Sequence, residues 1–297
     1  MEPKEVNKWV RNELCRRSFW EYCQEHDPEF FAAREFLKEI ADNFQWVYDE
    51  YKDGRPRRIS VSLPPRSGKS YLTSLFCAWW LGKSPDQAVM RNSCTDKLFC
   101  KLSYDVRDIV KSDLWREVFS NGLSDDKQNV HEWNLRTAKQ TSYFGAGVGG
   151  TIIGSGANLA ISDDLYRGMQ DALSSDYNNR VHQWKESAHD SRKEKNCPEI
   201  YIGTRWVLDD VIGRAKERGK IERDVVVPAL VDGVSFCEAV RSTEEYLEVK
   251  EDIDEFIWEA EYMQAPYELK GLLFPAKELI YFTPDEILKS NFESALS

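Results

Sequence analysis

The chain has 297 residues, of which 41% are hydrophobic, and its 10 Trp and 13 Tyr exclude an intrinsically disordered protein. The formal net charge of −11 argues against a protein that coats nucleic acid by general electrostatic attraction. The 7 scattered Cys form no C-x-x-C pair and lack metal-ligand spacing, which is typical of a reducing cytosol. The longest apolar run, residues 75–81, is too short to span a bilayer, so no membrane association is expected.

The first half of the chain alternates between helical and strand patterns. Large apolar residues recur at helical spacing over residues 1–50. Residues 58–63 (RISVSL) alternate as a strand does, and a helix is expected from Lys69 to about Gly82. The next strand and helix are predicted at residues 87–93 and 96–110.

The second half continues this alternation and then changes. We expect a Gly-rich loop at 145–156, a helical region at 171–195, and strands at 159–161, 199–203 and 224–227. Strands that alternate with helices predict an α/β fold with a mainly parallel central sheet flanked by helices. From about residue 232 the pattern becomes acidic and helical. We therefore divide the chain into a core with N-terminal helices (1–230) and a small helical lid and linker (231–297).

A phosphate-binding loop is predicted between the first strand and its helix. In PPRSGKS, Gly68 lets the backbone approach a phosphate, Lys69 brings a positive charge, and the Ser70 hydroxyl can ligate Mg²⁺. Leu63 stands where the common pattern has its first Gly, and Pro64 and Pro65 offer no N–H groups. The amides must therefore come mainly from residues 66–70, including Arg66 and Ser67. A chance G-K-S in a surface turn is the alternative.

Two other strand ends carry candidate chemistry. Asp163 and Asp164 follow an apolar run, and we assign Asp163 to the metal and Asp164 to the attacking water. We expect substitution of Asp163 to abolish hydrolysis without unfolding the protein, because Asp163 is expected to act on the metal and to lie outside the core. Thr204 and Arg205 follow the strand at 199–203, where open α/β sheets bind ligands. A solvated acidic turn and a capped turn with a surface Arg are the respective alternatives.

Six short stretches, taken together, resemble the ATPase domain of tailed-phage large terminases. They are PPRSGKS, AWWLGKSPD, GVGGTIIGSGANLAISDD, GTRWVLDDVIGR, VVVPAL and YMQAPYELKGLLF, in the order that the family has. The resemblance covers most of residues 36–275. It implies a P-loop NTPase of the ASCE type that uses ATP and Mg²⁺.

The resemblance also implies roles for single residues. Lys69, Ser70 and Arg66 match the Walker A residues, and Asp163 and Asp164 match the Walker B acids, although many relatives have Glu at the second place. Thr204 matches the motif that couples hydrolysis to movement. Gln45, with Phe44, is a candidate for contact with adenine, and a helix face is the alternative.

Two departures from the family pattern bear on function. The Gly-rich stretch at 150–154 lacks the arginine that many relatives carry, so Arg66, Arg205 and Arg214 become candidates for the cation that stabilises transition-state charge. The family's C-terminal nuclease domain would begin at about the last residue, so we expect no nuclease activity from this chain.

The resemblance implies a motor that drives double-stranded DNA into a procapsid in the host cell cytoplasm. Its expected partners are DNA, the portal protein and the small terminase subunit. A homo-oligomeric ring is expected on the capsid and a monomer in isolation. The basic clusters at 55–58, 192–195 and 214–220 could contact DNA, but each is also typical of a solvated face. The alternatives are another P-loop enzyme, such as a helicase or nucleotide kinase, and a non-enzymatic scaffold with a decayed loop.

Overall fold

The centre of the described structure is a mainly parallel sheet, as predicted, and this sheet has eight strands. The computed structural model describes residues 3–152 and 154–268. The strand order is β3-β4-β5-β2-β6-β7-β1-β8, and within this sheet, as described, the antiparallel pairs are β3–β4 and β4–β5. The strands are β1 (Arg58–Ser62), β2 (Val89–Ser93), β3 (Leu123–Gln128), β4 (Glu132–Leu135), β5 (Tyr143–Phe144), β6 (Leu159–Asp163), β7 (Glu199–Ile202) and β8 (Arg223–Val226).

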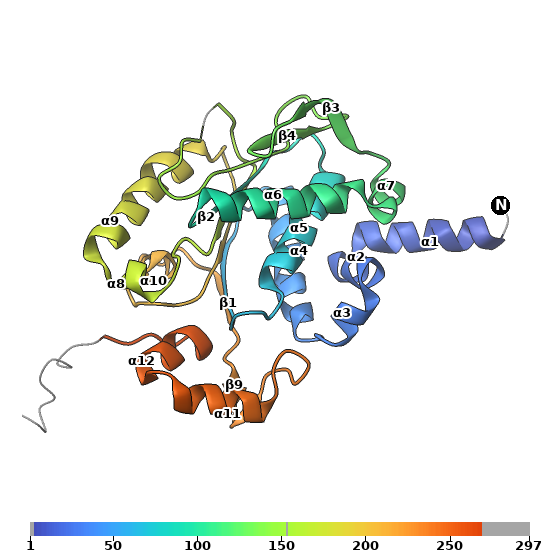
Figure 1. Cartoon of the computed structure of the whole chain (residues 1–297). Helices are drawn as coiled ribbons and strands as arrows, with labels where there is room; N and C mark the ends of the chain where they lie inside the picture. Colours follow the sequence, from blue (N-terminus) through green and yellow to red (C-terminus); the bar gives the residue numbers. More distant parts are fainter. Residues whose placement is uncertain (1–2, 153, 269–297) are drawn as a thin grey trace, which may run out of the picture. The chain divides into compact units, whose positions relative to one another are not determined.

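Helices cover both faces of this sheet. Figure 1 shows α4, α5 and α6 on one side of the central strands and α9 and α10 on the other. The helices are α1 (Pro3–Arg17), α2 (Phe19–His26), α3 (Pro28–Ala32), α4 (Leu37–Lys52), α5 (Lys69–Lys83), α6 (Asp96–Lys111), α7 (Asp113–Phe119), α8 (Met169–Leu173), α9 (Ser175–Trp184), α10 (Val211–Glu217), α11 (Thr243–Asp252) and α12 (Glu255–Ile257).

Alternation along the strands separates two hydrophobic cores. On β7, Ile200 and Ile202 belong to the core under α4–α6, whereas Tyr201 belongs to the core under α9 and α10. Successive strand residues point to opposite faces of a sheet, so a buried strand supplies both cores at once. All four residues of β7 and all five of β6 are buried, which is typical of central parallel strands.

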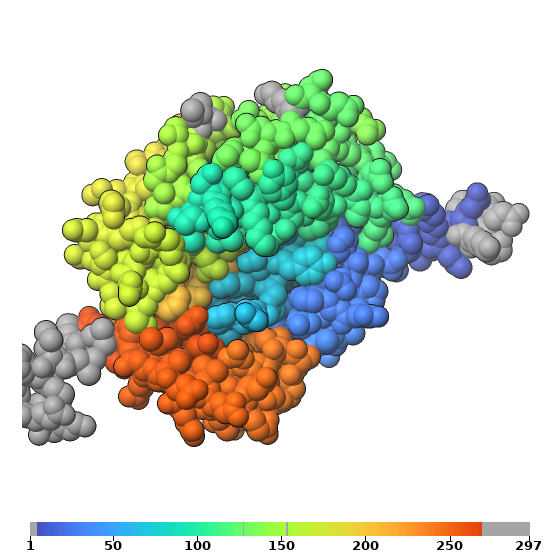
Figure 2. All heavy atoms as spheres, viewed as in Figure 1, coloured from blue at the N-terminus to red at the C-terminus, as the bar shows by residue number. Residues whose placement is uncertain are grey.

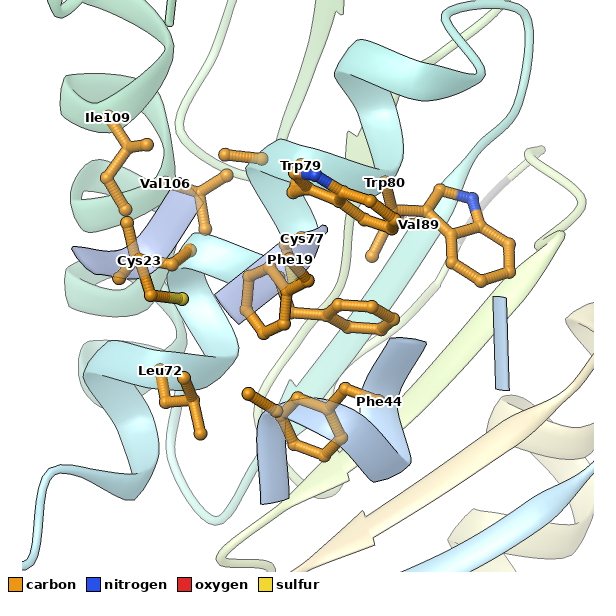
Figure 3. Close-up of a cluster of buried hydrophobic side chains, with 14 of the residues drawn as sticks. Phe19, Cys23, Phe44, Leu72, Cys77, Trp79, Trp80, Val89, Val106 and Ile109 are labelled. Atoms are coloured by element: carbon orange, nitrogen blue, oxygen red, sulfur yellow. The ribbon is translucent and has the colours of Figure 1, made fainter. Parts of the chain in front are cut away.

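The helix α5 lies deep in the larger core. Figure 3 shows Trp79 and Trp80 of α5 in one hydrophobic cluster with Phe19 and Phe44 from the N-terminal helices. Phe19 meets Trp79 with ring centroids 5.6 Å apart, and the Trp79 indole donates a hydrogen bond to the Cys15 carbonyl at 2.9 Å. Truncating one such aromatic residue costs about 3–5 kcal/mol, so this packing holds α5 firmly in place.

The structure differs from the predicted elements in several places. The region predicted as helical at 171–195 is divided, because Ser174 caps a new helix by accepting a hydrogen bond from Tyr177. A π-helix, Lys185–His189, and a 3-10 helix, Asp190–Arg192, then follow α9. Other elements are absent from the prediction, namely α7 and α10, the strands β3, β4 and β5, and a hairpin at residues 230–235.

The C-terminal described segment has a small hydrophobic cluster of its own. A two-stranded hairpin, β9 (Leu230–Val231) and β10 (Val234–Ser235), precedes α11, α12 and a π-helix, Trp258–Tyr262. The described residues up to Pro266 form one compact unit, so a boundary near residue 230 stays a prediction. Residues 269–297 of the predicted lid and linker lie outside the described residues. The hydrophobic cluster of this C-terminal segment contains Ala229, Leu230, Tyr246 and Trp258.

None of the described helices is long and apolar enough to cross a membrane.

Candidate functional site

The predicted phosphate-binding loop forms a tight turn between β1 and α5. Gly68 has φ +98° and caps the start of α5. A Cβ atom at Gly68 would lie 2.7 Å from the Phe30 ring, so both the backbone conformation and the space require glycine. Leu63, at the place of the usual first Gly, is fully buried and belongs to the core. The loop therefore rests on hydrophobic packing where other loops of this kind have a flexible residue.

Lys69 joins the ends of three neighbouring strands. Its Nζ lies 3.1 Å from Asp164 Oδ1 and 3.4 Å from Thr204 Oγ1. Asp164 directly follows β6 and Thr204 follows β7, and β6, β7 and β1 are adjacent in the sheet. Parallel strands place their carboxyl ends at one edge, which is where open α/β sheets bind ligands. The three segments singled out in the sequence therefore meet.

An open cavity of about 420 Å³ lies over this cluster. It is lined by loop residues, by the first turn of α5 and by the ends of β6 and β7. A second cavity, of about 460 Å³, shares Pro65 and Arg66 with the first and has α11 and the π-helix Trp258–Tyr262 on its other side. Figure 2 shows the surface of segment 229–266 (orange) adjoining the surface around the start of α5 (light blue). The first cavity is lined by Pro65, Arg66, Gly68, Lys69, Ser70, Tyr71, Asp164, Thr204 and Trp206.

Asp164 faces the cavity because the backbone turns at this residue. Its φ of +49° is in the left-handed region, which few non-glycine residues adopt. Its Oδ1 atom accepts a hydrogen bond from the Thr204 backbone N–H at 3.2 Å in addition to the contact with Lys69. The side chain remains 26% exposed, so it can reach a ligand in the cavity.

Asp163 lies in a different environment although it is the preceding residue. It is 1% exposed, and its Oδ2 atom accepts hydrogen bonds from Nε and Nη2 of Arg91, the former at 2.8 Å. Burial raises the pKa of the Asp163 carboxyl, and the Arg91 guanidinium beside it opposes that rise. The expectation that Asp163 lies outside the core is therefore wrong.

Arg91 connects this acid to α5. The side chain comes from β2 and is fully buried, its Nη1 donates to Ser74 Oγ at 2.8 Å, and its Nη2 donates to the Ser70 carbonyl at 3.2 Å. Our sequence analysis missed this residue. The available signal was a charged residue inside an otherwise buried strand, because buried charges must be paired.

The site has oxygen donors that suit a magnesium ion. Asp163 Oδ1 is buried and has no hydrogen-bond partner among the described residues. Ser70 lines the cavity, and its carbonyl meets the same arginine that holds Asp163. Hydroxyl, carboxylate and water oxygens are the ligands that Mg²⁺ prefers, so Ser70 and Asp163 fit this ion.

Arg205 is not brought to the cavity. Its Nε donates to Asp210 Oδ2 at 2.9 Å, and only 6% of the residue is exposed. Asp210 also caps α10 by accepting a hydrogen bond from Gly213 N–H at 2.7 Å, and a Cβ atom at Gly213 would lie 1.7 Å from the Leu208 carbonyl oxygen. In this structure the distinctive stretch GTRWVLDDVIGR therefore fixes the turn after β7. Arg214 is likewise held, by Asp209 at 2.6 and 2.7 Å.

Two other predicted residues have other surroundings. The Gln45 side chain accepts a hydrogen bond from Phe19 N–H at 2.8 Å and donates to the Arg17 carbonyl at 3.0 Å, so it fastens the α1–α2 junction and does not line the cavity. Ser67 is buried in the loop, and its hydroxyl has no partner among the described residues. Arg66, in contrast, lines both cavities.

Comparison with known proteins gives structural matches only. No family model and no curated protein matches the chain. The structure is similar to those of phage large terminases. The HK97 bacteriophage large terminase shares 16% identity and a TM-score of 0.48, over 71% of this chain and 46% of that one. A mutant of the ATPase domain of the Thermus phage P74-26 large terminase shares 14% identity and a TM-score of 0.47, over 69% and 87% of the respective chains. At these identities the likeness concerns the fold.

Proposed function

We propose that this chain is an ATPase that binds Mg²⁺-ATP in the cavity over the start of α5. The observation that carries the proposal is the meeting of Lys69, Asp164 and Thr204 at one open cavity. Nucleoside triphosphate hydrolysis needs a cation on the phosphates, a carboxylate near the attacking water and a polar group near the γ-phosphate. All three kinds of group converge here.

Each residue has a role in this proposal. The amides at the start of α5 and Nζ of Lys69 hold the β- and γ-phosphates. The Ser70 hydroxyl and Asp163, through water, hold Mg²⁺, which when bound neutralises charge on the phosphate oxygens. Asp164 orients the attacking water and accepts its proton, and Thr204 links the γ-phosphate region to the end of β7.

Arg66 is the candidate for the remaining cation of the site. It lines the cavity, whereas Arg205 and Arg214 are engaged with Asp210 and Asp209. A guanidinium can contact two phosphoryl oxygens at once, which suits charge that develops during transfer. A further arginine supplied by a neighbouring copy in a ring would complete the site, so we expect slow turnover from the isolated chain.

The biological role that we propose is the translocation of double-stranded viral DNA into a procapsid in the host cytoplasm. Support for it comes from the six ordered motifs of the sequence. A homo-oligomeric ring that works with the portal protein and the small terminase subunit is part of the same proposal. A strand-separation assay tests the helicase alternative, because unwinding by the purified chain would favour a helicase over a packaging motor.

Phosphate release from ATP by three proteins tests the proposed hydrolysis. Wild type should hydrolyse ATP, Lys69→Ala should not, and Lys111→Ala should match wild type, because Lys111 is an exposed residue paired with Asp108 on α6. Binding of a fluorescent ATP analogue reports separately on affinity. Equal turnover by wild type and Lys69→Ala would refute the site, and an absence of both binding and turnover in wild type would favour the scaffold alternative.

A further inference from the structure

Three side chains of different chemistry lie together at the start of α6, away from the cavity. Asp96 and Cys100 are four residues apart on α6, so they lie on the same face of the helix. His131 precedes β4 and reaches the same point: its Nε2 atom lies 2.9 Å from Asp96 Oδ1 and 3.6 Å from Cys100 Sγ. Cys100 Sγ lies 3.7 Å from Asp96 Oδ2.

These separations are close to those between the ligands of a zinc ion. Zinc–sulfur bonds of about 2.3 Å, with zinc–nitrogen and zinc–oxygen bonds of about 2.0–2.2 Å, place tetrahedral ligands roughly 3.4–3.7 Å apart. The two distances to sulfur, 3.6 and 3.7 Å, fall in this range. The distance between His131 Nε2 and Asp96 Oδ1 is shorter, 2.9 Å, and must lengthen for both atoms to bind one ion.

The backbone that carries His131 is held in place before any ion binds. Ser103 Oγ donates to the Val130 carbonyl at 2.6 Å, and the Trp133 indole donates to the same hydroxyl at 3.1 Å. His131 N–H donates to Asn129 Oδ1 at 3.0 Å. The site therefore needs little ordering to form, which favours affinity.

The ligand types indicate which metal the site would take. A thiolate and an imidazole select zinc over Mg²⁺ and Ca²⁺, which prefer oxygen ligands. The second His-containing cluster among the described residues is unsuitable, because Lys185 and Lys193 both donate to Glu199 there, at 2.8 and 2.9 Å. Among the described residues no lysine ammonium contacts Asp96, Cys100 or His131, and the side chains of Asp96 and His131 are 63% and 45% exposed.

We propose that Asp96, Cys100 and His131 bind one Zn²⁺ ion, with water as the fourth ligand. Binding displaces the thiol proton of Cys100 to solvent. The ion would fasten the segment before β4 to α6 and so stabilise the fold. This proposal is independent of the proposed ATPase activity.

Cobalt binding to the untagged, EDTA-treated 297-residue chain tests the proposal, because a cobalt–thiolate bond gives a charge-transfer absorption band. We expect one equivalent of Co²⁺ to produce this band, Zn²⁺ to abolish it, and Zn²⁺ to raise the melting temperature. The oxygen-only site at Ser70 and Asp163 cannot give the band. Cys100→Ser should lose the band, and His131→Ala should weaken binding by more than the about 10–100-fold that the loss of a second-shell partner costs.

The matched control is Cys237→Ser, which removes another partly exposed cysteine and should keep the band and the thermal shift. Circular dichroism checks that each variant is folded, and His131→Ala, on the segment before β4, serves if Cys100→Ser does not fold. The proposal is overturned if wild type shows no thiolate band with excess cobalt, or if the band persists in Cys100→Ser or is undiminished in His131→Ala.

Discussion

Two consecutive aspartates, Asp163 and Asp164, occupy very different parts of the molecule. Asp163 forms a buried ion pair with Arg91 between the sheet and α5. Asp164 lies at an open cavity, where it contacts Lys69. The strand period turns neighbouring side chains to opposite faces, and the left-handed backbone at Asp164 completes the separation. Two residues of identical chemistry therefore support different tasks, one through a buried ion pair and one through a partly exposed side chain at an open cavity.

Replacing the buried arginine should have the largest effect. Arg91→Met leaves Asp163 as an unpaired buried acid, and loss of one partner of a buried pair costs about 3–5 kcal/mol. Urea denaturation measures the change in free energy of unfolding. The double variant Arg91→Met with Asp163→Asn should recover part of that loss, because it removes the unpaired charge. A single variant that is as stable as wild type would show that the pair contributes little.

Replacing the partly exposed acid, Asp164, should affect chemistry and leave stability unchanged. Asp164→Asn should lower ATP turnover about 10²-fold or more, the range for loss of a general base, and should keep nucleotide binding. Asp163→Asn is the matched variant, and it should lower both turnover and stability. If the two variants lose stability equally, the contrast between the two aspartates fails.

Gly213→Ala tests whether the stretch after β7 is a structural element. The added methyl group would meet the Leu208 carbonyl, and such overpacking costs typically about 1–3 kcal/mol. Thermal melting should show the loss, and affinity for ATP should be retained below the melting transition. Gly219→Ala tests glycine loss without crowding, since nothing lies within 4 Å of that position, although its φ of +62° is also strained. A melting temperature of Gly213→Ala equal to that of wild type would contradict the packing argument.

The smallest predicted effect is a dependence on pH through His189. Burial lowers the pKa of this histidine in the folded chain. Below about pH 6.5 the imidazole is therefore protonated in the unfolded chain while it stays neutral in the folded chain. The free energy of unfolding should therefore fall between pH 7 and 5.5, by about 1 kcal/mol from this residue. His189→Gln should flatten the fall measured by denaturant titration. An unchanged slope in that variant would assign the effect to other groups.

The sequence predicted the sheet and the three strand ends because those features depend on local patterns. Apolar runs followed by Gly, Asp or Thr mark where β6 and β7 end, and β1 ends just before Pro64 and Pro65, which cannot continue a central strand. The strands β3 and β4 were missed because NGLSDDKQNVHEWNL is polar and lacks a clear alternation. Edge strands carry such charged residues, which hide them from a hydrophobicity pattern.

The directions of long side chains could not be predicted in the same way. Arg205 and Gln45 stand at positions that motif order links to a ligand, but other groups hold them. Arg205 contacts Asp210, five residues along the chain, and Gln45 contacts the α1–α2 junction, 26 residues away at Phe19. Arg91, in contrast, belongs to none of the motifs, and its contact with Asp163 could not be predicted because the two residues are 72 positions apart in the sequence. The cluster of Asp96, Cys100 and His131 likewise needs the hairpin to meet α6, so cysteine spacing alone gave no signal.

The ion pair between Lys69 and Asp164 has a consequence for selectivity. The positive charge at the start of α5 is already neutralised by a carboxylate 3.1 Å away. A simple anion such as sulfate or inorganic phosphate gains little by approaching a lysine whose charge is satisfied, and it also meets repulsion from Asp164. A ligand that arrives with its own divalent cation escapes that repulsion, so the resting protein should discriminate against the abundant small anions of a cell.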